Sequence, residues 1–237
     1  MHHSSCPLCK SDAISLFVHA TDHTVSHEAF GIWKCSNCTG MFTQDAPGED
    51  AIGKYYQSSS YISHSDTKEG LINRLYHRVR KITLTGKRKL VRRFAQTRSG
   101  TILDIGCGAG AFLSEMKGAG WQITGLEPDS TARKNAENLY GIKPHPSPQL
   151  FALQPAQFDA ITMWHVMEHV HPVHEYFGKM FDLLKDDGVL MIAVPNFTSS
   201  DASKYKSYWA AYDVPRHLYH FSPESMKRIV SLHYMKV

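Results

Sequence analysis

The stretch "LDIGCGAG", residues 103–110, decides the fold of this 237-residue chain. It overlaps the apolar, β-branched run "TILDI" (101–105), which is the pattern of a buried strand, and then places a glycine at every second position. The segment "AFLSEMKGAG" (111–120) follows, with apolar residues at helical spacing and two glycines that end the helix. A strand, a glycine turn and a helix in this order begin a nucleotide-binding βαβ unit.

The same alternation continues toward the C-terminus. Five segments follow in the order strand, helix, strand, helix, strand: "WQITGLE" (121–127), "DSTARKNAENLY" (129–140), "FDAITMW" (158–164), "PVHEYFGKMFDLLK" (172–185) and "GVLMIAV" (188–194). This alternation predicts an α/β fold with a doubly wound, mostly parallel sheet that is covered on both faces. Ligands of such sheets bind at the carboxyl ends of the strands.

The glycine pattern alone does not choose the ligand. Gly106, Gly108 and Ala111 satisfy the fingerprint of dinucleotide binders, and Glu127 lies about 20 residues further on, where a ribose hydroxyl is held. Asp104, however, stands two residues before the first glycine, and a carboxylate there would be repelled by a pyrophosphate. S-adenosylmethionine brings an ammonium, a sulfonium and ribose hydroxyls but no phosphate. The acid therefore favours S-adenosylmethionine over a nicotinamide dinucleotide.

Four segments together resemble the ordered motifs of class I S-adenosylmethionine-dependent methyltransferases. They are "LDIGCGAG" (103–110), "GLEPD" (125–129), "FDAITMWHVMEHV" (158–170) and "GVLMIAVPN" (188–196). The resemblance covers about 95 residues in the family's order and implies both the Rossmann-like fold and the cofactor.

The resemblance also implies roles for particular residues. The methionine and ribose side of the cofactor is expected to be lined by Asp104, Gly106, Cys107 and Gly108. Further along, Glu127 is expected to accept from the ribose hydroxyls, with Pro128 near the adenine, and the methionine moiety is expected to be bordered by Trp164 and His165. Cys107 is interpreted as a small residue in a tight turn. The family's adenine-contacting acid is not found in residues 145–157.

Four of the five cysteines occur in two C-x-x-C pairs about 25 residues apart: Cys6, Cys9, Cys35 and Cys38. This spacing favours a closed tetrahedral zinc site over disulfides or over thiols that are merely buried. The segments "SLFVH" (15–19) and "FGIWKC" (30–35) are expected to form a hairpin between the pairs. The segment resembles a zinc ribbon, and a closed structural zinc holds shape or contacts a partner.

The positive charge is concentrated in one segment. The chain carries a net charge of +4, but residues 74–98 contain ten Lys or Arg and no Asp or Glu. Apolar residues at helical spacing predict two helices with basic outer faces, over 71–82 and 87–95. These faces are either simply solvated or meet a phosphate-bearing partner such as an anionic membrane surface, a lipid-linked substrate or RNA.

The expected organisation is a zinc ribbon (1–46), a connecting segment (47–98) and a methyltransferase core (99–237). The Tyr/Ser-rich stretch "GKYYQSSSYISHSD" (53–66) is expected to be a loop or short helix lying over another part of the protein, or a linker. The core ends where its family adds an antiparallel hairpin, so that hairpin is expected to be missing. No apolar run reaches the length of a membrane span or a signal peptide, which leads us to expect a cytoplasmic protein.

Candidates for binding the methyl acceptor and for proton transfer cluster in two segments, "HVMEHVH" (165–171) and "WAAYDVPRHLYHFSP" (209–223). His169 is the first candidate for a general base and His217 the competing one, because imidazole accepts a proton near neutral pH. The remaining candidates for contacts with the acceptor are Glu168, Trp209, Arg216 and His220. Among them, Arg216 is expected to hold an anionic group of the acceptor. Ser222 and Pro223 predict the start of a capped helix.

The segments "EHV" (168–170) and "PRHLYHFSP" (215–223) also resemble small-molecule methyltransferases, including quinone-precursor O-methyltransferases and enzymes of surface-glycan and antibiotic-sugar pathways. In the quinone group a metal is associated with an E-x-x-E-H motif, but His165 stands at its first position here, so that metal is not expected. We expect methyl transfer to the oxygen or carbon of a small molecule. The alternatives are an RNA base methyltransferase, in which the basic segment tracks phosphates, and a non-catalytic interaction protein.

Overall fold

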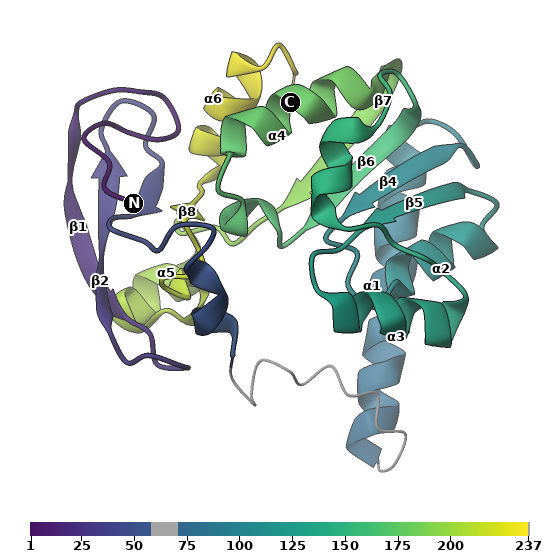
Figure 1. The fold of residues 1–237 in the computed structure, drawn as a ribbon, viewed down its shortest axis with the longest axis horizontal. Coiled ribbons are helices and arrows are strands. Elements are labelled where there is room, and N and C mark those ends of the chain that lie inside the picture. The colour runs from purple at the N-terminus through teal and green to yellow at the C-terminus, as the bar shows by residue number, and fades with distance from the viewer. Residues whose placement is uncertain (58–70, 237) are drawn as a thin grey trace. The chain divides into compact units, whose positions relative to one another are not determined.

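The computed structural model describes residues 1–57 and 71–236, with only the backbone for 71–77. Contacts divide the chain into two compact units (Figure 1). We call Met1–Ser65, Met167–Phe177 and Val194–Val237 the ribbon unit, and Asp66–Val166 and Gly178–Ala193 the sheet unit. The domain boundaries expected from the sequence stay a prediction.

The sheet unit is built on four parallel strands in the order β5-β4-β6-β7. Their bounds are Thr101–Ile105 for β4, Gln122–Leu126 for β5, Phe158–Trp164 for β6 and Leu184–Ala193 for β7. The predicted parallel α/β sheet is therefore confirmed. In the register, Asp104 lies opposite Gly125 on one side and Thr162 on the other. The carboxyl ends of β4, β5 and β6 consequently lie at one edge of the sheet.

Helices of the expected kind separate these strands (Figure 1). They are α2 (Ala111–Gly118), α3 (Ser130–Tyr140) and α4 (Val173–Leu183), with a short 3-10 helix, η2 (Ser147–Ala152), before β6. α3 begins where Asp129 accepts a hydrogen bond from the amide of Ala132, and it ends at Gly141, whose φ of 62° suits glycine.

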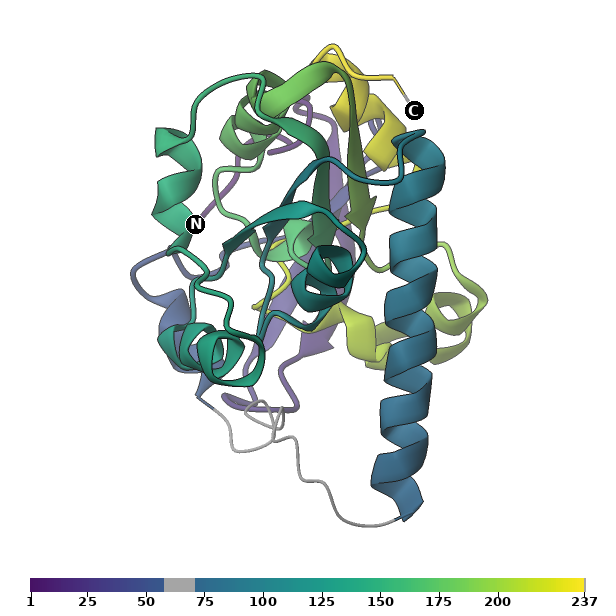
Figure 2. The ribbon, with the colours of Figure 1, turned by 90° about the vertical axis from the view of Figure 1, so that its right-hand side faces the viewer.

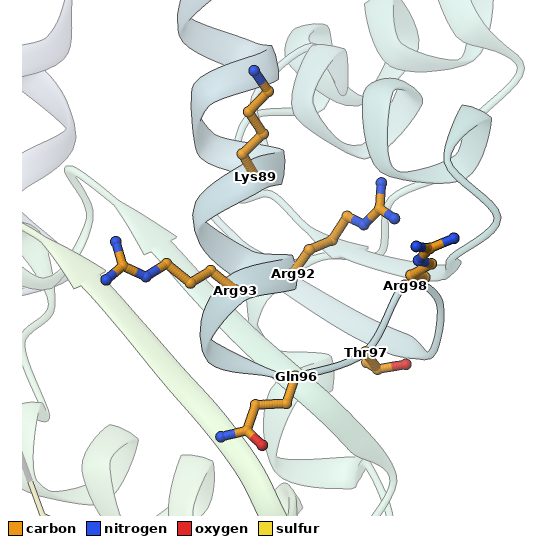
Figure 3. Close-up of a pocket in the computed structure, with 6 residues that line it drawn as sticks. All are labelled: Lys89, Arg92, Arg93, Gln96, Thr97 and Arg98. Carbon is orange, nitrogen blue, oxygen red and sulfur yellow. The ribbon is translucent and has the colours of Figure 1, made fainter.

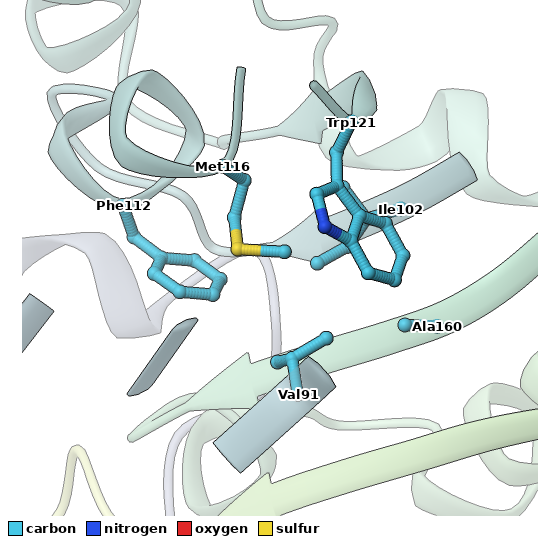
Figure 4. Close-up of a cluster of buried hydrophobic side chains, with 6 residues drawn as sticks. All are labelled: Val91, Ile102, Phe112, Met116, Trp121 and Ala160. Atoms are coloured by element: carbon cyan, nitrogen blue, oxygen red, sulfur yellow. The ribbon is translucent and has the colours of Figure 1, made fainter. Parts of the chain in front are cut away.

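A cluster of buried apolar side chains joins helices and strands of the sheet unit. Figure 4 shows its members pointing toward one another: Val91, Ile102, Phe112, Met116, Trp121 and Ala160. They come from the helix before β4, from α2, from the turn before β5, and from strands β4 and β6, and each is at most 5% exposed. Burying this apolar surface holds the helices on the sheet.

The expectation of two basic helices was wrong. Residues 71–94 form one helix, α1 (Leu71–Phe94), which Figure 2 shows as continuous. The intervening residues 83–86 include Thr and Gly, which lower helix propensity without removing any backbone donor. Thr83 Oγ1 donates to the carbonyl of Val79, a bond that a continuous helix accommodates.

The ribbon unit contains an antiparallel sheet in the order β1-β2-β3-β8. The predicted hairpin is confirmed as β1 (Ile14–Thr21) and β2 (Ala29–Cys35). β3 (Met41–Thr43) pairs with β8 (Tyr219–His220), which comes from the far end of the chain. The C-terminal segment therefore completes the sheet that the cysteine-rich segment begins.

Short helices make up the rest of the ribbon unit. They are η1 (Ile52–Tyr56), η3 (Met167–His169), α5 (Ser200–Tyr205), η4 (Lys206–Tyr208), η5 (Ala210–Tyr212) and α6 (Pro223–Leu232). The predicted cap of α6 is confirmed, because Ser222 and Ser225 each bind the other's backbone amide. Most of the Tyr/Ser-rich stretch lies outside the described residues. Among those residues, every helix is too short or too polar to cross a membrane.

Candidate functional site

The glycine turn after β4 is shaped to admit a ligand. Gly106 and Gly108 have φ values of 71° and 53°, which glycine adopts without strain. A Cβ atom at Gly106 would collide with Val166, whereas none of the described heavy atoms lies within 4 Å of the corresponding position at Gly108. The turn is therefore packed on one side and open on the other.

Asp104, in β4, presents a buried carboxyl group at this turn. It is 2% exposed, and its Oδ1 accepts a hydrogen bond of 2.6 Å from Thr162 Oγ1 on the neighbouring strand. Burial raises the pKa of Asp104 to about 7, although the Thr162 bond and the charge of Lys87 act in the opposite direction. A cationic ligand group beside such a buried carboxyl group would stabilise its ionised form.

Glu127 supplies a second buried carboxylate directly after β5. Its Oε2 accepts from the amide of Gly108 at 2.8 Å, and its Oε1 accepts from the amide of Asp129 at 3.0 Å. Burial raises the pKa of Glu127, opposed by these backbone hydrogen bonds. Arg133 donates to the carbonyls of Glu127 and Pro128, at 2.7 Å each, and so holds the backbone of this loop.

An aromatic group lies at the end of β6, the strand next to β4. The Trp164 ring has Lys87 Nζ 4.4 Å from its centroid and the Phe112 ring edge-on at 5.6 Å. His165 follows with a φ of 60°, and its amide donates to the carbonyl of Ala193 at 2.8 Å. The positive φ turns the chain sharply away from the strand direction at His165.

Seven of the eight residues expected to bind the cofactor border three neighbouring strand ends of the sheet unit, and Pro128 follows in the next loop position. Cys107 is 8% exposed, and burial raises the pKa of its thiol, which therefore stays protonated. Two buried carboxylates at one sheet edge disfavour an anionic pyrophosphate and suit an ammonium group and ribose hydroxyls. The donor set thus fits S-adenosylmethionine.

The raised pKa of Asp104 predicts that cofactor affinity depends on pH. The ammonium group of a ligand interacts with the ionised carboxylate, so affinity should be at its plateau above pH 7 and fall as the group is protonated below pH 7. We expect a loss of roughly 10²-fold between pH 7.5 and pH 5 in calorimetric titrations with S-adenosylhomocysteine. In the matched variant Asp104→Asn the weak residual binding should lose this dependence, and an unchanged pH profile would contradict the assignment.

The four paired cysteines converge in the ribbon unit. One sulfur atom from each lies within 4.8 Å of the others: Cys6, Cys9, Cys35 and Cys38. Cys6 and Cys38 have Sγ atoms 3.6 Å apart, as do Cys9 and Cys35. Disulfides require about 2.05 Å. Tetrahedral zinc with Zn–S bonds of about 2.3 Å places its sulfur ligands about 3.8 Å apart. The spacing thus fits a zinc ion.

Two histidines meet in the ribbon unit, with ring centroids 4.6 Å apart. His169 Nδ1 lies 3.0 Å from the carbonyl of Arg216 and 3.0 Å from Tyr56 Oη. Because a carbonyl only accepts, Nδ1 carries the hydrogen and Nε2 keeps the lone pair. Burial, followed by the charge of His217, lowers the pKa of His169 to about 4, so its ring is neutral at pH 7.

His217 has the same arrangement of ring nitrogens. Its Nδ1 donates to the carbonyl of Ala211 at 2.9 Å, which again leaves the lone pair on Nε2. Its backbone carbonyl accepts from Thr43 Oγ1 at 2.6 Å, and the amide of Thr43 donates to the carbonyl of Leu218 at 2.9 Å. Strand β3 therefore holds the segment that carries His217. Glu168, His169 and His217 also offer ligand atoms within 4.8 Å of one another, a donor set that a divalent metal ion accepts.

The other residues expected to contact the acceptor make protein contacts within the ribbon unit. Arg216 is 1% exposed and donates to Asp22, Asp213 and the carbonyl of Tyr55. His220 is buried beside Thr43, and burial lowers its pKa to about 3. Glu168 is 1% exposed, and Trp209 packs edge-on against Tyr212.

The contacts of Arg216 explain why its expected role finds no support. Asp22 and Asp213 pair with the guanidinium at 3.0 and 2.6 Å, and Asp22 has its pKa held low by backbone hydrogen bonds and by Arg216. Two carboxylates already balance the positive charge of this buried arginine. The ion pairs therefore act within the unit, and the arginine attracts an anionic acceptor only weakly.

Sequence reasoning missed several residues of the site. Thr162 and Lys87 touch or approach Asp104 from 58 and 17 positions away, and Tyr56 reaches His169 across 113 positions. The alternation of β6 could have indicated Thr162, a polar residue in a buried strand. For Lys87 and Tyr56 the sequence carries no such signal.

Comparisons with known proteins agree with this geometry. A fold of this topology, with an acid at the glycine turn and another after the next strand, is typical of Rossmann-like methyltransferases. A family model described as "Methyltransferase domain" matches residues 76–232. The chain belongs to this family.

Curated relatives cover a smaller region. A "Ubiquinone biosynthesis O-methyltransferase" from Glaesserella parasuis is 34% identical over 114 residues, covering 41% of this chain and 46% of that protein. One from Rhodopseudomonas palustris is 29% identical over 100 residues, covering 40% of each chain. This chain thus spans about two fifths of the length of the curated relatives it matches.

The fold is shared with solved structures. A SAM-dependent methyltransferase from Archaeoglobus fulgidus superposes with a TM-score of 0.51 at 24% identity, covering 63% of this chain and 68% of that one. At this identity the similarity establishes the fold.

Proposed function

We propose that this protein transfers a methyl group from S-adenosylmethionine to an oxygen or carbon atom of a small molecule. The observation that carries the proposal is the pair of buried carboxylates, Asp104 and Glu127, at the glycine turn. When bound, the donor supplies an electrophilic methyl group. The protein's part is to orient donor and acceptor for one in-line displacement, and orientation supplies up to roughly 7–11 kcal/mol of the barrier reduction.

The small-molecule acceptor is supported by the curated relatives, which are named for an O-methylation in ubiquinone biosynthesis. To test it, the protein is incubated with methyl-labelled S-adenosylmethionine and a cell extract that has been separated into small molecules, RNA and protein. Label in the small-molecule fraction supports the proposal. Label confined to RNA would instead make the protein an RNA methyltransferase, and no labelled fraction would favour a non-catalytic role.

Within this proposal, His169 is the general base that accepts a proton from the acceptor. Its Nδ1–H bond to the Arg216 carbonyl orients the ring and leaves the Nε2 lone pair for the acceptor. The lowered pKa keeps the ring unprotonated at pH 7, so the base is available without prior loss of a proton. His217, whose ring is oriented by Ala211 in the same way, is the competing candidate.

Substituting the base should slow turnover without weakening cofactor binding. We expect His169→Gln to lower kcat by roughly 10²-fold or more, with S-adenosylhomocysteine affinity within a few-fold of the wild type. His217→Gln is the matched control. If His217→Gln alone shows the large loss, the two roles are exchanged, and if neither variant slows turnover the protein uses positioning alone. Activity that disappears with a chelator and returns with Mg²⁺ or Mn²⁺ would make the Glu168–His169–His217 group a metal site.

The cysteine cluster is proposed to hold one structural zinc ion. Its four thiolates would close the coordination sphere, so the ion supports shape and takes no direct part in methyl transfer. Strand β3 begins three residues after Cys38 and binds the backbone of His217 and Leu218 through Thr43. The ribbon is thereby proposed to position the histidine segment. Reduced thiolate ligands suit the reducing cytoplasm, which is the proposed location.

A further inference from the structure

Helix α1 carries an apolar stripe that the core of the sheet unit does not use. The side chains of this stripe are 39–66% exposed: Val79, Ile82, Leu90 and Phe94. At 3.6 residues per turn, positions 79, 82, 90 and 94 lie on one face of a helix. The stripe therefore runs along about four turns of α1.

The stripe is separate from the face that packs on the sheet. The core face consists of Val91, which is fully buried, with Leu84 and Ala95 packed beside it. At about 100° per residue, this face lies roughly 120° or more around the helix from the centre of the stripe. α1 thus has one apolar face for its own unit and a second one that the described residues leave exposed.

Positive charge borders the exposed stripe. Near the C-terminal end of α1 an open pocket of about 410 Å³ is lined by Lys89, Arg92, Arg93, Gln96, Thr97 and Arg98. Figure 3 shows Arg92 and Arg98 pointing to one side of the helix end and Arg93 to the other. Residues 71–98 contain no Asp or Glu. Arg88, on the core side, pairs with Glu115 of this unit.

We propose that this face of α1 docks on an anionic phospholipid surface, with the stripe in the interface and the pocket cations on lipid phosphates. An exposed apolar stripe flanked by cations is the pattern of helices that lie in such an interface. A second copy of the chain is a poorer partner for this face, because two α1 helices would bring like charges together. The four aliphatic and aromatic stripe residues would gain nothing from RNA phosphates, and only Phe94 offers a stacking ring.

The test is sedimentation of this 237-residue chain with lipid vesicles. We expect binding to vesicles containing phosphatidylglycerol, weak or no binding to pure phosphatidylcholine, and a steep loss of binding as salt increases. Binding to both kinds of vesicle alike would contradict the role of the cations. A failure to bind either would overturn the proposal.

Charge-reversal variants locate the surface. The triple variant Lys89→Glu, Arg92→Glu, Arg93→Glu should weaken binding by at least about 10²-fold, at roughly 5-fold or more per cation. The matched control reverses three exposed lysines outside α1, Lys117, Lys134 and Lys227. An equal loss in the control would mean that binding follows net charge and not α1.

A second pair of variants tests the stripe. Ile82→Gln with Phe94→Gln should weaken vesicle binding by 10-fold or more, because buried apolar area is lost while the charge is kept. Leu139→Gln with Leu232→Gln removes two side chains of similar exposure elsewhere and should change binding little. Both pairs lie on the surface, so folding should survive. Dimerisation that the stripe variant abolishes, or RNA binding without vesicle binding, would replace the lipid by another partner.

Discussion

Replacing Asp104 with asparagine should remove most cofactor affinity while making the fold more stable at pH 8. The Asp104 carboxylate is the charged group expected to bind the ligand's ammonium, and a hydrogen bond to a charged group contributes about 1.5–3 kcal/mol, more when both groups are buried. We therefore expect S-adenosylhomocysteine to bind about 10²–10³-fold more weakly. The Thr162 hydrogen bond can be kept, because the asparagine Oδ1 also accepts.

The stability change follows from the raised pKa. Burial raises the pKa of Asp104 from an ordinary value of 3.8 to about 7, so ionisation costs the folded state up to about 4 kcal/mol above pH 7. This cost is absent near pH 4, where the carboxyl is protonated in the folded protein. Asp104→Asn should therefore raise the free energy of unfolding at pH 8, by about 1–4 kcal/mol, and change it little at pH 4.

A neighbouring aspartate provides the control for this measurement. Asp159, in strand β6, has its pKa lowered by hydrogen bonds from Lys185 and Thr101 that outweigh burial. Asp159→Asn should thus lose stability at pH 8 and leave cofactor affinity unchanged. If Asp104→Asn behaves like Asp159→Asn in both respects, Asp104 is a structural acid and the cofactor site is wrongly assigned.

Removing the zinc site should strongly reduce activity but leave cofactor binding in place. Structural zinc contributes about 10–16 kcal/mol of apparent binding free energy to small zinc-dependent folds. Cys6→Ser with Cys38→Ser should therefore remove the metal and unfold the sheet of the ribbon unit. Turnover should then fall by 10²-fold or more, because strand β3 no longer holds the His217 segment through Thr43.

Elemental analysis and hydrogen exchange together check this expectation. The wild type should contain about one zinc per chain, and the double variant close to none, with fast amide exchange in β1 and β2. Cys107→Ala is the matched control, because this fifth cysteine belongs to the sheet unit and should keep the zinc. A wild-type protein purified without chelator that contains no zinc would exclude the ribbon, and a cysteine variant with full activity would exclude its positioning role.

Local sequence patterns predicted the sheet unit well because its elements are continuous and strongly patterned. The apolar, β-branched run 101–105 is typical of a buried strand, and the residues of α2 and α3 repeat at helical spacing between glycine stops. The structure adds Asp129 as the cap of α3 and Gly141 as its end, which follow from backbone chemistry. The single helix α1 was not predicted: Thr and Gly in 83–86 lower helix propensity, but they keep every backbone donor and the helix continues through them.

The ribbon unit was only half predictable. Its first hairpin follows from alternation and from the cysteine pairs, but β8 is two residues long and pairs with a strand about 180 residues earlier. Such short strands carry no periodic signal. Arg216 shows the same limit, because its sequence neighbourhood suggests an anion site while its partner Asp22 lies 194 positions away.

Cofactor choice is the central claim, and calorimetric titration of the wild-type protein tests it most directly. S-adenosylhomocysteine and NAD are titrated separately at pH 8, where Asp104 is ionised. The buried carboxylates at the glycine turn predict that S-adenosylhomocysteine binds at one site per chain and that NAD binds at least about 10²-fold more weakly, since its pyrophosphate meets Asp104 and Glu127. Tighter binding of NAD than of S-adenosylhomocysteine would contradict the account.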